Sequence, residues 1–214
     1  MLDEKVAKLL NTQINKEFYS AYLYLSFSNY FTQQGLDGFA NWYSVQAQEE
    51  RDHALLFMKY MQNNDAVVTL EAVEQPIGKF ADYASVLSAS LEHERYVTGL
   101  INNIYDAAHT VKDYRTVQFL DWFVKEQGEE EKNAGDLVRK MELYGSDPKA
   151  LYMLDSELAA RTYAAPTLTL CRAGAKGEKT KAGGPAFAGP PACDVQAGSV
   201  FKACQSASQA RRGC

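Results

Sequence analysis

Apolar residues recur at steps of three and four along most of this chain, over residues 3–163. That period is typical of amphipathic α-helices, which bury one face and expose the other. The pattern is interrupted at Gly35, Pro76, Gly78 and Gly145, which are residue types that commonly end helices or form turns. The pattern therefore predicts four long helices and a short fifth one, over residues 3–33, 37–63, 82–109, 113–144 and 147–163.

The links between these helices differ in length. The first and second helices are joined by a few residues around Gly35, and the third and fourth by a few residues before Asp113, so each pair should be antiparallel. Residues 65–79 have no periodicity and form a long connection that carries the chain back along the bundle. We therefore expect an all-α four-helix bundle with one long crossover. Asp147 and Pro148 supply an N-cap and a first-turn proline for the short fifth helix.

Residues 164–214 differ in composition from residues 1–163. They are rich in Ala, Gly, Pro, Ser and Lys and carry a net charge of +5, whereas residues 1–163 carry −10. Few of their apolar residues lie close together, so the segment cannot bury enough surface to offset the entropy lost on ordering. We therefore expect one folded domain over 1–163 and a disordered low-complexity tail over 164–214. The tail holds all four cysteines, whose spacing fits no paired metal knuckle: Cys171, Cys193, Cys204 and Cys214.

The acidic charge of residues 1–163 limits the partners of the domain. A general nucleic-acid binder needs Lys and Arg to displace counterions from phosphate, so we expect no nucleic-acid partner. An acidic surface concentrates cations instead. The start of the chain lacks the apolar stretch of a signal peptide, and no segment has the roughly 20 apolar residues of a membrane helix. Because the domain also lacks cysteine, we expect a cytoplasmic protein without a membrane partner.

The core-facing stripe of each long helix is interrupted by polar side chains near its midpoint. Antiparallel helices of similar length bring their midpoints to one level, so these side chains should converge. Converging carboxylates repel one another and lose hydration, which costs several kcal/mol per unpaired ion unless a multivalent cation neutralises them. Glu50 and His53, three residues apart, lie on one helix face and can share a metal. The converging residues are Glu17, Glu50, His53, Glu94 and Gln127.

The donor types of this set narrow the choice of metal. Most donors are oxygen, one is nitrogen and none is sulfur. Such a set excludes structural zinc and copper(I) and indicates iron or manganese. Redox activity at such a site favours iron over manganese.

Each residue of the set also has an ordinary structural interpretation. A lone His53 on an apolar face is more often a satisfied core histidine, and a lone Glu17 could bend to solvent. Tyr24 and Trp122 would be core residues if considered alone. Four stripes interrupted at matching heights are improbable in a bundle without a site, and this joint pattern favours the metal hypothesis. The remaining histidines, His93 and His109, are assigned to the surface.

The fourth helix carries several carboxylates close to its interruption. Its predicted core-facing stripe passes through Val124, Gln127 and Glu131. The run of glutamates at 129–131 would usually be a solvated face. Gly128 lies in the middle of this helix, where glycine costs up to about 1 kcal/mol relative to alanine.

Four strings around the converging residues resemble the bacterial non-haem ferritins. They are Asn-Lys-Glu-Phe-Tyr-Ser-Ala-Tyr-Leu-Tyr around Glu17, Gln-Ala-Gln-Glu-Glu-Arg-Asp-His ending in His53, Leu-Glu-His-Glu-Arg around Glu94, and Glu-Gln-Gly-Glu-Glu-Glu-Lys around Gln127. The four motifs in this order are highly specific, and the resemblance covers residues 1–163. It implies a ferritin-like bundle that stores iron.

The resemblance also implies a ferroxidase centre, which oxidises Fe(II) with dioxygen or peroxide. Twenty-four subunits would close into a hollow shell that holds a hydrated ferric oxide mineral, with the fifth helix at the four-fold axes. The implied ligands are Glu17, Glu50 and His53 for a first iron, Glu50, Glu94 and Glu130 for a second, with Gln127 nearby, and Glu49, Glu126, Glu129 and Glu130 for a third, with Tyr24 as a neighbour of the centre.

Other members of the superfamily differ at readable positions. Bacterioferritins carry a second Glu-x-x-His, where this chain has Gln127 and Glu130, and a haem-binding methionine, where Asp52 stands beside His53. We therefore expect no haem. Two rival functions are a DNA-protecting shell of the mini-ferritin kind and a ferritin-like peroxidase or oxygenase. The first places its ligands across a subunit interface and lacks a fifth helix, and the second would need the missing histidine.

Overall fold

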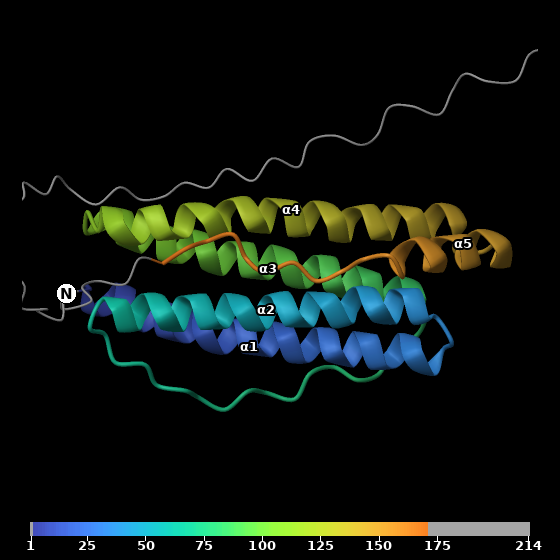
Figure 1. Cartoon of the computed structure of the whole chain (residues 1–214), viewed down its shortest axis with the longest axis horizontal. Helices are drawn as coiled ribbons and strands as arrows, with labels where there is room; N and C mark the ends of the chain where they lie inside the picture. The colour runs from blue at the N-terminus through green and yellow to red at the C-terminus, as the bar shows by residue number, and fades with distance from the viewer. Residues whose placement is uncertain (1, 171–214) are drawn as a thin grey trace, which may run out of the picture. The chain divides into compact units, whose positions relative to one another are not determined.

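A computed structural model describes residues 2–170 of the chain. Within residues 2–170 the chain forms helices and no strand (Figure 1). Each of these helices is too short or too polar to span a bilayer. The prediction of a four-helix bundle with a short fifth helix is confirmed. The helices are α1 (Glu4–Gln33), α2 (Asp37–Asn63), α3 (Tyr83–Thr110), α4 (Tyr114–Tyr144) and α5 (Pro148–Leu158).

Aspartate side chains fix the starts of four of these helices. Asp3 accepts hydrogen bonds from the backbone nitrogens of Lys5 and Val6, at 2.9 and 3.3 Å. Such caps satisfy amide groups that the first turn of a helix leaves without partners. The sharp turn between α1 and α2 depends on Gly35, whose φ of 73° lies in the left-handed region. The other capping residues are Asp82, Asp113 and Asp147.

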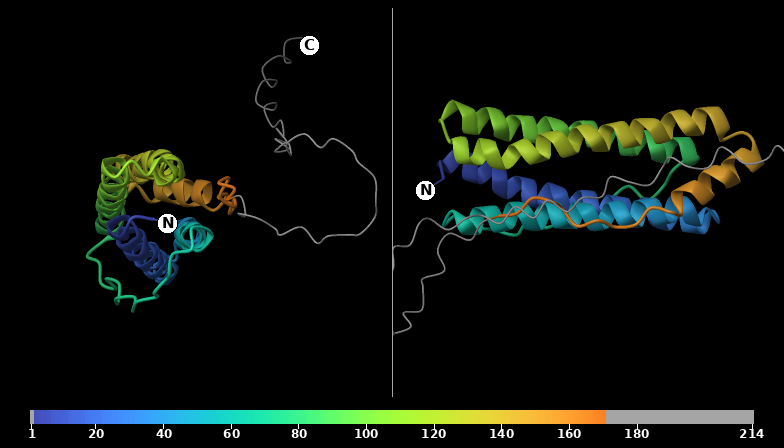
Figure 2. Two further views of the ribbon diagram at one scale, coloured as in Figure 1. Left: turned by 90° about the vertical axis from the view of Figure 1, so that its left-hand side faces the viewer. Right: turned by 45° about the horizontal axis from the view of Figure 1, so that its top comes forward.

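The four long helices form a bundle of two antiparallel pairs (Figure 2). Helix α1 packs along α2, α3 packs along α4, and α1 also contacts α3. The connection between α2 and α3 runs outside the bundle along α1, as the long crossover requires (Figure 1). Asn11 on α1 holds it, because its side chain donates to the carbonyl of Thr69 at 3.0 Å and accepts from the Thr69 amide at 2.8 Å.

Two apolar clusters fill the bundle, one toward each end. One contains Leu10, Phe57 and Ile101 and the other contains Phe27 and Leu87. The polar side chains of the helix midpoints lie between them. Both clusters exclude water, so any charge at the midpoint is held in a low-dielectric environment.

Helix α5 ends at Leu158, five residues before the predicted end at Tyr163, so that boundary was wrong. The side-chain amide of Asn41 on α2 donates to the carbonyl of Arg161 at 2.9 Å and lies within 3.5 Å of the carbonyl of Leu158. Carbonyls at a helix end need such external donors, and here a neighbouring helix supplies them. This tertiary contact is not visible in the sequence of α5.

The expected boundary between folded domain and tail lies at residue 164, but residues beyond it still pack against the bundle. Leu168 and Leu170 pack against the apolar cluster that contains Leu10. The remainder of the predicted tail, residues 171–214 with all four cysteines, lies outside the described residues.

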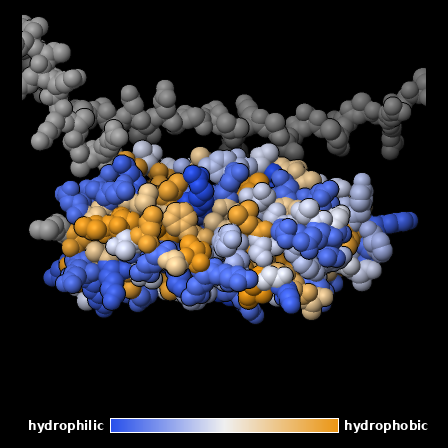
Figure 3. All heavy atoms as spheres, turned by 90° about the horizontal axis from the view of Figure 1, so that it is seen from below, coloured by the Kyte–Doolittle hydropathy of each residue, from blue (hydrophilic) through white to orange (hydrophobic). Residues whose placement is uncertain are grey.

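One face of the bundle carries several exposed apolar side chains (Figure 3). They belong to α1 and to the crossover, two segments that the Asn11 contacts hold side by side. Apolar groups gathered on one face commonly mark a surface that contacts another molecule. The residues are Tyr22, Leu25, Val67, Leu70, Val73 and Ile77.

Candidate metal centre

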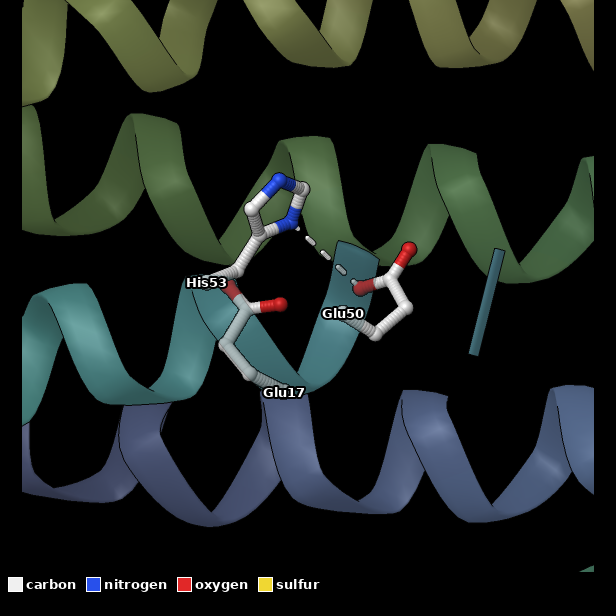
Figure 4. Close-up of side chains that lie close together, drawn as sticks. All are labelled: Glu17, Glu50 and His53. Carbon is white, nitrogen blue, oxygen red and sulfur yellow. Dashed lines mark ion pairs between the residues drawn. The ribbon is translucent and has the colours of Figure 1, made fainter. Parts of the chain in front are cut away.

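Ligand-type side chains from all four long helices meet between the two apolar clusters. Glu17 comes from α1, Glu50 and His53 from α2, Glu94 from α3 and Glu130 from α4. Glu17 is 1% exposed, and the other four are also buried. Figure 4 shows Glu17 reaching from α1 toward Glu50 and His53 on α2. The structure thus brings together residues that are up to 113 positions apart in the chain.

Three groups of side chains have potential ligand atoms within 4.8 Å of one another. Glu50 belongs to two of the groups, and so do His53 and Glu130. Membership of two groups is what a bridging carboxylate requires, because each of its oxygens can face a different cation. The groups are Glu17 with Glu50 and His53, Glu50 with Glu94 and Glu130, and His53 with Glu126 and Glu130.

Amide and hydroxyl groups hold the carboxylates in place. The Gln46 amide donates to both Glu50 and Glu130, each at 2.9 Å. The Tyr24 hydroxyl donates to Oε1 of Glu94, and the amide of Gln127 donates to Oε2 of Glu94 at 3.2 Å. These neutral donors fix the orientation of the carboxylates without adding charge. Gln127 therefore lies beside the three groups and contacts Glu94.

Some buried polar atoms of the centre have no hydrogen-bond partner among the described residues. They are Oε2 of Glu17, Nδ1 of His53 and Oε2 of Glu130. The Nδ1 atom of His53 lies 3.7 Å from Oε2 of Glu50, which is too long for a hydrogen bond. Buried polar atoms without partners are costly, and a metal ion bound between them would satisfy them. An oxygen-rich set with one imidazole fits Fe(II).

Burial and mutual repulsion change the proton affinities of these groups. Burial, helped by the charge of Glu50, raises the pKa of Glu17 to about 8 and that of Glu94 to about 8. Burial alone would lower the pKa of His53, but the Glu50 carboxylate outweighs it and raises that pKa to about 9. Glu50 has a lowered pKa, because His53 outweighs the effect of its burial. The metal-free centre thus keeps protons that a bound cation would have to displace.

The residues expected around a third iron lie in different surroundings. Glu126 is half-buried and joins His53 and Glu130 in one of the three groups. Glu49 forms an ion pair with Arg161 from the segment after α5. Glu129 is exposed and lies 3.2 Å from Lys125. The structure therefore brings Glu126 to the centre but not Glu129.

Sequence reasoning gave no role to several residues that contact the centre. Gln13 donates to Glu17 at 2.8 Å, and its position one turn earlier on the same helix face was a usable signal. Gln46 lies four residues before Glu50 on the same face of α2 and could have been noticed in the same way. Arg161 carried no such signal. His93, assigned to the surface, is half-buried, and its Nε2 lies 2.8 Å from the hydroxyl of Ser20.

The fold and the centre together define a class of protein. Four antiparallel helices with one long crossover, carrying inward-facing glutamates and a Glu-x-x-His pair, form the architecture of the ferritin-like carboxylate proteins. The model of the ferritin-like domain family matches residues 7–144, which include every residue of the three ligand groups. This chain belongs to the ferritin-like domain family.

Similar proteins agree with this assignment. A bacterial non-heme ferritin from Campylobacter jejuni is 41% identical over 155 residues, which cover 72% of this chain and 93% of that protein. A probable bacterial non-heme ferritin-like protein from Haemophilus influenzae is 38% identical over 158 residues, which cover 74% of this chain and 96% of the relative. Among solved structures, an open-pore ferritin from Archaeoglobus fulgidus superposes with a TM-score of 0.74 at 43% identity, over 76% of this chain and 100% of that one.

Proposed function

We propose that this protein stores iron, and that it oxidises Fe(II) at a dinuclear centre formed by Glu17, Glu50, His53, Glu94 and Glu130. The observation that carries the proposal is the double role of Glu50, which belongs to two neighbouring ligand groups. One carboxylate shared by two groups holds two cations close together. Relatives named as bacterial non-heme ferritins support iron as the cation.

In the proposed reaction, each of two Fe(II) ions gives one electron to the oxidant. Dioxygen accepts both electrons with two protons and becomes hydrogen peroxide, or hydrogen peroxide accepts both with two protons and becomes two water molecules. Glu17 and His53 bind the first iron, Glu94 and Glu130 bind the second, and Glu50 bridges them. The carboxylates stabilise Fe(III) more than Fe(II), because anionic oxygen ligands favour the higher charge. Glu17 and Glu94 release protons as Fe(II) enters, since both have a pKa of about 8 in the metal-free protein.

The arrangement within one chain favours this function over the two rivals. The ligand groups are complete without a second subunit, unlike those of a mini-ferritin. Position 127, where a second Glu-x-x-His motif would begin, is Gln, and its partner at 130 is Glu rather than His. A symmetric oxygenase-type centre would need that histidine.

We also propose that the subunits assemble into a shell of about twenty-four copies, as bundles of this fold commonly do in closed symmetric oligomers. The exposed apolar face over α1 and the crossover supports self-association, since single subunits in water would leave it uncovered (Figure 3). Light scattering of the purified protein measures the number of subunits in the assembly.

We also propose that the protein is cytoplasmic, because the absence of cysteine from residues 1–163 fits a reducing cytoplasm.

Aerobic addition of Fe(II) to the metal-free full-length protein tests the function. Ferric absorbance and oxygen uptake should rise far faster than in buffer, and Glu50→Ala and His53→Ala should each slow the initial rate at least about tenfold. Glu142→Ala is the matched control, because Glu142 is exposed and lies about 18 Å along α4 from Glu130. If both site variants oxidise Fe(II) as fast as this control, the assigned centre is wrong.

A further inference from the structure

The segment that follows α5 lies along the side of the bundle between α2 and α4. Residues 159–170, which we call the strap, run back along this side in Figure 1 and in the right-hand view of Figure 2. Tyr163 donates a hydrogen bond to Asp52 on α2, and the indole of Trp122 on α4 donates to Thr167 at 3.1 Å. Trp122 also contacts the ring of His53, with 5.5 Å between centroids. The strap therefore passes over the side of the bundle on which His53 lies.

Arg161 is the cation that the strap brings to this side. Its guanidinium forms an ion pair with Glu49, donates to Oε1 of Gln46 at 2.8 Å and lies 4.1 Å from the ring centroid of Trp42. The side chains of Arg161 and Glu49 are only 17% and 20% exposed. A planar guanidinium held by several partners in partial burial binds a carboxylate more firmly than an exposed lysine does.

Arg161 acts on the dinuclear centre indirectly, through its hydrogen bond to Gln46. Because Oε1 of Gln46 accepts from Arg161, its Nε2 faces inward and donates to Glu50 and Glu130. A rotated amide would place an oxygen against two carboxylates and leave the guanidinium without this acceptor. Arg161 therefore fixes the direction in which the Gln46 amide points.

Glu49 is the carboxylate with which Arg161 forms its ion pair. Its neighbour Glu50 belongs to the dinuclear centre, and the charges of His53 and Glu126, two members of the group with Glu130, act on the Glu49 carboxylate. Oε2 of Glu130 is buried and has no hydrogen-bond partner in the described part of the chain, so this group can still accept a cation. With Glu49 neutralised by Arg161, a cation there lacks one anionic ligand and faces a fixed positive charge nearby.

We propose that Arg161 is a built-in counter-cation that limits this side of the centre to the two metal ions of the dinuclear site by withholding Glu49 from a third. The inference rests on the proposed function, because it concerns metal ions bound at the same carboxylates. Arg161 is a positioning residue here, since it acts through Glu49 and Gln46. Loss of its charge would release Glu49 toward Glu126 and Glu130.

Titration of the metal-free full-length protein with Co(II), followed by calorimetry and by its visible absorption, tests the proposal without iron oxidation. The parent should bind two ions per subunit, and Arg161→Gln should bind a third with an affinity at least about tenfold higher than any third ion in the parent. Lys140→Gln is the matched control, because it removes the same charge from a partly exposed pair with Glu157 on another part of the bundle. Equal third-ion affinity in Arg161→Gln and Lys140→Gln would overturn the inference.

A second variant tests the same idea with the strap unchanged. Glu49→Gln in the parent should leave the stoichiometry at two ions, and in combination with Arg161→Gln it should abolish the third ion. Loss of an ion from the parent on Glu49→Gln would contradict the proposal even if Arg161→Gln failed to fold. Failure of the proposed function would give a different result, because Glu50→Gln would then not reduce the Co(II) binding of the parent.

Discussion

The side-chain nitrogen of Gln46 lies 2.9 Å from Oε1 of Glu50 and 2.9 Å from Oε1 of Glu130. One neutral amide thus joins the carboxylates of α2 and α4 at the level where the bundle carries most buried negative charge. The contact explains how the metal-free protein tolerates two acids so close together. Gln46 thus positions two carboxylates of the centre, although its own side chain is uncharged.

Replacement of Gln46 should therefore destabilise the metal-free protein. Gln46→Leu leaves two buried carboxylates short of a donor, which costs on the order of 1–3 kcal/mol. Thermal unfolding should show a lower midpoint without metal, and Zn(II) should restore much of the difference, because a bound cation replaces the lost donor. Gln62→Leu, at an exposed position of α2, is the control and should change the midpoint little. An unchanged midpoint in metal-free Gln46→Leu would contradict this account.

Two buried tyrosines offer a matched pair of substitutions. Tyr24 donates to Glu94, whereas the hydroxyl of Tyr43 has no hydrogen-bond partner among residues 2–170. Tyr24→Phe should lower the stability of the metal-free protein by about 1–2 kcal/mol, and Tyr43→Phe should be neutral or slightly stabilising. Calorimetry of the two variants gives the comparison. The argument fails if Tyr43→Phe is the more damaging of the two.

The stability of the metal-free protein should fall as pH rises from about 4.5 to about 9. Glu17 and Glu94 have a pKa of about 8 in the folded chain, against an ordinary value of 4.5, so folding favours their protonated forms. That preference becomes a growing penalty as pH rises from the ordinary value to the raised one. The pKa of His53 is raised from 6.5 to about 9, so its favourable contribution is complete below 6.5 and is lost through 9. Deprotonation of each of these three groups therefore lowers the free energy of unfolding as pH rises.

Unfolding midpoints at several pH values, with and without Zn(II), measure this dependence. The double variant Glu17→Gln, Glu94→Gln should have a flatter profile, because it removes two of the three titrating groups. Zn(II) binding near neutral pH should release protons into a weakly buffered solution, since bound ligands are deprotonated. A midpoint that rises between neutral and alkaline pH without metal is the result that would refute the assignment of these pKa shifts.

Two glycines in helices should respond oppositely to alanine. A Cβ at Gly38 would lie 1.7 Å from the backbone oxygen of Asp155, so Gly38→Ala must push α5 away from α2. A Cβ at Gly128 meets nothing within 4 Å, so Gly128→Ala should stabilise α4 by up to about 1 kcal/mol. Thermal unfolding of the two variants checks both signs. A stable Gly38→Ala protein with α5 still docked, as judged by slow amide exchange in α5, would contradict the close approach.

Helical periodicity was sufficient to predict the bundle and to select the buried polar residues that meet on three of its helices. Glu17, Glu50, His53 and Glu94 interrupt strong apolar stripes, and all four are buried together in the structure. The fourth helix shows the limit of this reasoning. The predicted stripe is right at Gln127, which is buried, but wrong at Val124 and Glu131. Val124 is 43% exposed and Glu131 is only half-buried, whereas Phe123 and Glu130 face inward. Steps of three and four allow two neighbouring registers, and only packing against α3 decides between them.

By itself, the sequence determined that polar side chains of α1, α2 and α3 reach the interior of this protein, because burial of an apolar face is a local and periodic property of each helix. Only the tertiary structure decided which partners those side chains receive. The early end of α5 at Leu158 depends on Asn41, and the pairing of Glu49 with Arg161 depends on a segment that returns over α2. Residues so far apart in the chain come into contact through the packing of whole helices and loops, and no local sequence pattern predicts such contacts.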